Sequence, residues 1–131
     1  MAYNIPLRVR NLIKRAGTSN PRQIATYLGI KVKFVDTPTH INGFWMRILR
    51  RKFIFVNERL DEWQQNAVIA HEIAHIRLHP KYRYFCEDSR SYYCSRKHEN
   101  EADFFAVNLL SYSSPDIESY YVDKFLKDGW K

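Results

Sequence analysis

The sequence has few of the residues that mark fibrous, disulfide-rich or membrane proteins. Its 131 residues include 4 glycines and 5 prolines, which excludes a collagen-like or low-complexity chain. The 2 cysteines are too few for the disulfide framework of a small secreted protein. No hydrophobic run approaches the roughly 20 residues of a bilayer-spanning helix, and the N-terminus lacks the apolar core of a secretory signal. We therefore expect a cytoplasmic protein with no membrane partner.

The residues that are present favour one folded domain. A length of 131 residues suits one ordinary domain and is short for two, so we expect residues 1–131 to form a single domain. Hydrophobic residues make up 45% of the chain and aromatic residues 15%, which is enough to bury a core. The net charge is +7, but the basic residues are spread along the chain without a run of five. We therefore do not expect a dedicated nucleic-acid surface.

The N-terminal half predicts two short helices followed by strands. An amphipathic segment over residues 7–16 ends at Gly17, and a second helix begins at Pro21 after a polar cap. Residues 30–35 alternate between apolar and polar side chains, as a half-buried strand does. Residues 43–57 predict a hairpin. The basic tip of this hairpin is expected at Arg50, Arg51 and Lys52.

The C-terminal half predicts three helices. Asp61 followed by Gln64 has the pattern of a capping box, so the longest helix is expected over residues 62–79. Further helices are expected over residues 98–110 and from Ser114. Together with the strands, these elements predict an α+β fold, in which a three-stranded sheet packs against the long helix and flanking helices.

The long helix contains the segment His71-Glu72-Ile73-Ala74-His75. Residues four apart on a helix differ by about 40° of rotation and one turn of rise, so both imidazoles can reach one cation. Glu72 is placed to take a proton from a water that this metal activates. A catalytic zinc has three protein ligands and one open position, so a third ligand is required.

The alternative is a buried helix that contains two histidines for no chemical reason. Apolar side chains surround the motif on nearly every side, leaving mostly Asn66 and Arg77 for water. Burying two histidines and a glutamate without a partner would be unfavourable. We therefore prefer the metal-ligand interpretation. The apolar residues around the motif are Ala67, Ile69, Ala70, Ile73, Ala74, Ile76 and Leu78.

The third ligand is expected from the helix over residues 98–110. Glu99 and Asp103 share one face of this helix with Ala102 and Ala106, which would let the two helices approach closely. Glu101 projects about 200° away from Glu99 and is expected to be solvated. We assign Glu99 as the third ligand. Asp103 would accept a hydrogen bond from the far nitrogen of a ligating histidine, unless the two carboxylates are an ordinary exposed pair.

The segments HEIAH, IRLHP and ENEADFFAVNLL resemble the ImmA/IrrE family of small zinc metallopeptidases. The resemblance covers roughly residues 20–112 and departs after Leu110, where the family often continues LL-x-P. It implies a small zincin-like, gluzincin-type domain with a Zn²⁺ site. It also implies a protease of phages or mobile elements that often acts on a repressor. The family's E-x-x-A-(N/D)-x-F-A segment is matched by Glu99, Ala102, Asp103, Phe105 and Ala106.

Two functions follow from these observations. The first is a zinc-dependent endopeptidase with a narrow protein substrate, such as a helix-turn-helix repressor, which could add as a strand to the hairpin of residues 43–57. The second is a metal-containing binding module that contacts a regulator or nucleic acid without cleaving it. The ligand set also accepts manganese. The residue that stabilises the oxyanion is left open among His40, Tyr82, Tyr84, Tyr92, Tyr93 and His98.

A further group of metal-binding residue types lies between the two site helices. A structural zinc bound by His79, Cys86, Cys94 and His98 is one interpretation, because thiolates and imidazoles suit zinc. We favour the other, in which His79 completes its helix near the carboxyl end and both cysteines are reduced and unpaired. On that interpretation the chain holds one zinc ion.

Overall fold

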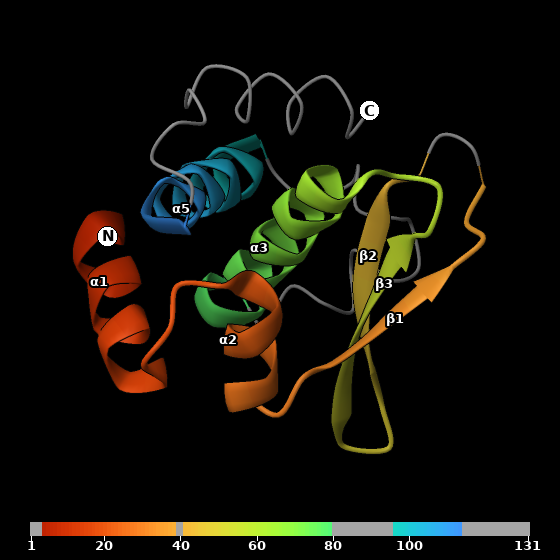
Figure 1. The fold of residues 1–131 in the computed structure, drawn as a ribbon, viewed down its shortest axis with the longest axis horizontal. Coiled ribbons are helices and arrows are strands. Elements are labelled where there is room, and N and C mark those ends of the chain that lie inside the picture. Colours follow the sequence, from red (N-terminus) through yellow and green to blue (C-terminus); the bar gives the residue numbers. More distant parts are fainter. Residues whose placement is uncertain (1–3, 39–40, 80–95, 114–131) are drawn as a thin grey trace.

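The computed structural model describes residues 4–38, 41–79 and 96–113 and confirms the predicted α+β fold (Figure 1). The helix predicted from Ser114 lies outside the described residues. In chain order, the elements are α1 (Ile5–Ala16), α2 (Pro21–Tyr27), β1 (Lys31–Val35), β2 (Gly43–Ile48), β3 (Arg51–Asn57), α3 (Glu62–Leu78) and α5 (Arg96–Ser113).

The three strands form one mixed sheet in the order β1-β3-β2. β1 runs parallel to β3, with Lys31 opposite Phe53. β2 runs antiparallel to β3, with Gly43 opposite Val56. Within the described part of the chain, β2 pairs on one side alone, so the edge required for strand addition by a peptide is present.

The tip of the hairpin differs from the prediction. Ile48 pairs with Arg51, so the connection is the two residues Leu49 and Arg50. Arg51 and Lys52, which we expected at the tip, belong to β3. Leu49 and Arg50 have positive φ values of 49° and 72°, as a type I′ turn requires. Such turns favour Asn and Gly, and the absence of both residues here concealed the turn.

The predicted helix boundaries depend on local hydrogen bonds that the structure contains. Gly17 ends α1 in the left-handed conformation, with φ of 75°. Asn20 caps α2 by accepting a hydrogen bond from the backbone N–H of Arg22. At the start of α3, Asp61 and Gln64 make both hydrogen bonds of the capping box, at 2.9 and 3.2 Å.

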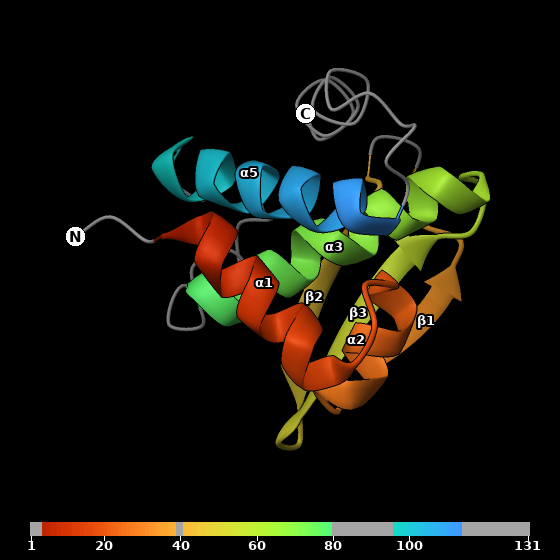
Figure 2. The same ribbon diagram turned by 60° about the vertical axis from the view of Figure 1, so that its left-hand side comes forward.

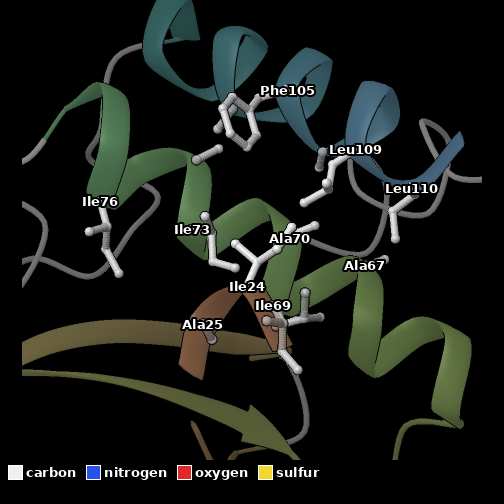
Figure 3. Packing of buried hydrophobic residues seen from close by; sticks show 14 of the residues in the cluster. Ile24, Ala25, Ala67, Ile69, Ala70, Ile73, Ile76, Phe105, Leu109 and Leu110 are labelled. Atoms are coloured by element: carbon white, nitrogen blue, oxygen red, sulfur yellow. The ribbon is translucent and has the colours of Figure 1, made fainter. Parts of the chain in front are cut away.

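α3 is the central helix of the molecule. In two views it lies between the sheet and α5, with α2 beside it (Figure 1, Figure 2). In Figure 3, Phe105, Leu109 and Leu110 of α5 extend toward α3. Every residue from Ala67 to Ile76 is buried. The predicted position between two layers is therefore confirmed.

The two polar residues that we expected on the outside of α3 behave differently. Arg77 is exposed, as predicted. Asn66 is half-buried, and its side-chain oxygen accepts a hydrogen bond of 2.9 Å from Nε of Arg22 on α2. α2 therefore covers a part of α3 that we had assigned to water. None of the described helices has the length and apolar composition needed to cross a membrane.

Candidate metal centre

The HExxH residues and the α5 carboxylates meet where α3 packs against α5. His71 and His75 lie one turn apart on α3, and both are buried. Glu99 lies in the first turn of α5, where a negative charge is favoured by the helix dipole. Ala102 and Ala106 of α5 and Ala74 of α3 are completely buried, as expected for two helices in close contact.

Three ligand-type atoms converge at this point. The Nε2 atoms of His71 and His75 are 3.1 Å apart. Oε2 of Glu99 lies 3.1 Å from Nε2 of His71 and 3.2 Å from Nε2 of His75. These distances approach the roughly 3.3 Å between ligand atoms of a tetrahedral zinc with bonds of about 2.0–2.1 Å. Two imidazoles and a carboxylate are also ligands that zinc prefers, so these residues fit a divalent metal.

Asp103 lies on the far side of the His71 ring. Its Oδ1 atom is 3.0 Å from Nδ1 of His71, whereas Nε2 of that ring faces Glu99. A carboxylate in this position orients the ring and favours the tautomer whose Nε2 is free to bind a metal. Glu99 and Asp103, one turn apart on α5, therefore lie against opposite nitrogens of the same ring.

Glu72 is an almost completely buried carboxylate, with 2% of its surface exposed. Burial raises the pKa of Glu72, although the charges of His71 and His75 oppose the increase. Among the described residues, its Oε2 atom has no hydrogen-bond partner. A buried carboxylate with an available oxygen and a raised pKa is suited to accept a proton.

The charges of the cluster are strongly coupled. Burial lowers the pKa of His71, but Asp103 and Glu99 outweigh that effect and raise it to about 10. Burial raises the pKa of Glu99, but His71 and His75 outweigh it and hold that pKa below its usual range. The cluster therefore favours a positive charge between Glu99 and Asp103, as a cation site does.

One residue in this region contradicts the sequence prediction. Glu101, which we expected in solvent, has a side chain that is 14% exposed, and its Oε1 atom lies 2.8 Å from Nε2 of His79. The prediction considered only the face of α5 toward His71 and His75. α3 continues for another turn and also covers the face that carries Glu101. The spacing of His79, four residues after His75, was the available signal.

The remaining candidates fall into two groups. His79 ends α3 as predicted, and its N–H donates to the carbonyl of His75. His79 and His98 of the possible structural zinc site lie together, with ring centroids 4.1 Å apart. Several predicted candidates lie outside the described residues, namely His40, Tyr82, Tyr84, Cys86, Tyr92, Tyr93 and Cys94.

Comparison with known proteins agrees with the predicted resemblance. The peptidase M78 family, described as the IrrE N-terminal-like domain, matches residues 25–112. The "Uncharacterized immunity region protein 2" of Bacillus phage phi105 is 36% identical over 106 residues, which cover 81% of this chain and 67% of that protein. No solved structure matches the chain. Because the family match covers most of the sequence, the chain belongs to the IrrE N-terminal-like peptidase family.

Proposed function

We propose that this protein is a zinc-dependent endopeptidase with a narrow protein substrate. The observation that carries the proposal is the convergence of His71 and His75 of α3 with Glu99 of α5, within 3.2 Å of one another. The buried Glu72 lies on α3, next to His71. Membership of a peptidase family supports the same chemistry. The proposed reaction is hydrolysis of a peptide bond.

The proposed roles follow from the positions of the side chains. His71, His75 and Glu99 would hold the ion, and Asp103 would keep the ring of His71 in its ligating orientation. A bound zinc ion polarises a carbonyl group and lowers the pKa of a water molecule. Glu72 would accept a proton from the attacking water and then donate it to the leaving amine nitrogen. The burial of Glu72 favours this role because a raised pKa makes the protonated state accessible.

We propose a transcriptional repressor of a phage or mobile element as the substrate. This proposal is supported by the similarity to an immunity region protein of a phage and by the peptidase family. A helix-turn-helix repressor encoded beside this protein is the first candidate to test. The alternative is a module of the same fold that binds such a regulator and keeps its metal but does not cleave.

The Glu72→Gln variant separates these two functions. The zinc-loaded protein is incubated with the neighbouring repressor, and fragments are identified by mass spectrometry. We expect the variant to retain zinc, because Glu72 is not a proposed ligand, and to cleave about 10²–10⁴-fold more slowly. Glu62→Gln is the matched control, because it changes an exposed glutamate on the same helix, and it should cleave at the wild-type rate.

Two outcomes would contradict the proposal. If Glu72→Gln cleaved the repressor at the wild-type rate, Glu72 would not be the group that accepts the proton. Full inactivation of the repressor by Glu72→Gln without any fragment would favour the binding module instead.

A further inference from the structure

A second cluster of ligand-type side chains lies one helical turn beyond the centre described above. Nε2 of His79 is 2.8 Å from Oε1 of Glu101. The rings of His79 and His98 lie with centroids 4.1 Å apart and planes tilted by 33°. One ligand atom from each of His79, His98 and Glu101 lies within 4.8 Å of the other two. These atoms are therefore close enough together for one ion to bind all three.

The cluster repeats the chemistry of the first site with different residues. Each site takes two imidazoles and one carboxylate, which are ligands typical of zinc. His79 follows His75 at the same four-residue spacing that separates His75 from His71. His98 and Glu101 are three residues apart on α5, so they occupy neighbouring positions on its surface.

The cluster is partly shielded from solvent, because His79 is buried and His98 and Glu101 are half-buried. The side chain of His79 is 2% exposed and that of Glu101 is 14% exposed. His79 ends α3, and its backbone N–H donates a hydrogen bond of 2.8 Å to the carbonyl of His75. A polar group in such surroundings is favourable only when it is bound to a partner. The positions of all three side chains are thus set by the same two helices that place the first site.

We propose that His79, His98 and Glu101 bind a second divalent ion of the zinc type. The simpler explanation is a metal-free hydrogen bond between His79 and Glu101, with the ring of His98 packed beside it. A shared ion accounts for the convergence of all three.

The second ion has a structural role in this proposal. It joins His79, the C-cap of α3, to the first turns of α5, the same turns that carry Glu99. The rings of His75 and His79 lie 5.7 Å apart between centroids, so the two sites are separate but adjacent. An ion that links the two helix ends would hold Glu99 at the position from which it reaches His71 and His75.

The test counts zinc ions in the full chain. The protein is stripped of metal with a chelator, reloaded with zinc and separated from free zinc by gel filtration. Zinc per chain is then measured by inductively coupled plasma mass spectrometry. We expect two ions in the wild type and one in both His98→Ala and Glu101→Gln. His71→Ala should also bind one ion, because it removes a ligand of the first site alone, and the matched control Lys97→Ala should keep two.

The same experiment includes the results that would overturn the second site. A wild-type count of one that falls to zero in His71→Ala would overturn it, as would a count of two in both His98→Ala and Glu101→Gln. The Cys86→Ser/Cys94→Ser variant should keep two ions. A fall to one in that variant, with two ions retained in Glu101→Gln, would assign the second ion to thiolates and contradict the proposal. Circular dichroism of each metal-free variant should match that of the metal-free wild type, which excludes unfolding as the cause of a lost ion.

Discussion

The two sides of α3 bury residues of different kinds. On the side toward α2 and the sheet, apolar residues pack together, with Ile69 near Ile24 and Ala25 (Figure 3). On the side toward α5, the buried surface includes His71, His75 and their carboxylate partners. An apolar contact tolerates other side chains of similar volume, whereas a buried polar cluster requires particular partners at particular distances. The comparison indicates that the α5 side combines an apolar core with a polar cluster that depends on particular partners, whereas the sheet side depends mainly on apolar volume.

The largest effect is expected from His71→Ala on the α5 side. The variant removes one proposed ligand and leaves Asp103 and Glu99 without the ring that lies between them. We expect it to lose the ion of the first site. When free zinc is present at about 1,000 times its Kd, its binding adds about 4 kcal/mol to the free energy of unfolding. Because the variant loses this contribution, its melting temperature should fall clearly. Calorimetry with and without zinc measures the fall.

Chelation provides an independent measure of the same contribution. Removing metal should destabilise the wild type substantially more than His71→Ala, which has already lost the first ion. Arg77→Ala is the control, because Arg77 is exposed on the same helix. This variant should keep the wild-type melting temperature and the wild-type response to the chelator. An equal effect of the chelator on wild type and His71→Ala would contradict the assignment of His71 as a ligand.

An intermediate effect is expected from Gly43→Ala on the sheet side. A Cβ atom at Gly43 would lie 2.5 Å from Cγ1 of Val68 on α3 and 2.7 Å from the backbone oxygen of Phe55 on β3. Because the backbone oxygen cannot move aside easily, we expect a loss of about 1–3 kcal/mol, measured by urea unfolding. The number of zinc ions per chain should not change.

A double variant tests the cause of that loss. Gly43→Ala combined with Val68→Ala removes one of the two close contacts. The combination should be more stable than the sum of the two single effects predicts, which a double-mutant cycle detects. A loss of zinc from Gly43→Ala would show instead that the two sides of α3 are not independent.

An effect of similar size, on metal affinity and not on folding, is expected from Asp103→Asn. The substitution keeps the shape of the side chain but removes the charge that lies 3.0 Å from Nδ1 of His71. Replacing such a partner of a ligating histidine typically weakens metal binding about 10–100-fold, which corresponds to about 1.4–2.7 kcal/mol. Competition with a chromophoric chelator measures the affinity. An unchanged affinity would show that Asp103 does not contribute to metal binding by His71.

Much of the site was predictable because its geometry is local to each helix. The spacing of His71 and His75 puts both rings on one side of α3 whatever the rest of the chain does. The same rule puts Glu99 and Asp103 on one face of α5, and the structure brings these four side chains together. The spacing of His79 signalled a further polar position on α3, but which face of α5 meets it depends on how the two helices pack, so Glu101 was wrongly assigned to solvent.

In the sheet, too, the local strand patterns were predictable and the pairing between strands was not. The alternation of residues 30–35 and the apolar hairpin strands predicted a three-stranded sheet, and the structure contains one. The parallel pairing of β1 with β3 was not predictable, because nothing in either strand distinguishes its partner. The exact position of the turn at Leu49 and Arg50 was set by the antiparallel register of β2 with β3.

The sequence alone determined the capped helix ends at Gly17, Asn20 and Asp61 and which side chains share a helix face, because caps and helical periodicity act over three or four residues. It did not determine the start of α1 or either end of α5, which extend beyond the predicted ranges 7–16 and 98–110. Only the tertiary structure decided which faces meet. The packing of α5 against α3 brings Glu99 to His71 and His75, and Glu101 to His79. The reason is physical, since contacts between residues more than 20 positions apart depend on the burial of whole surfaces and not on any local pattern.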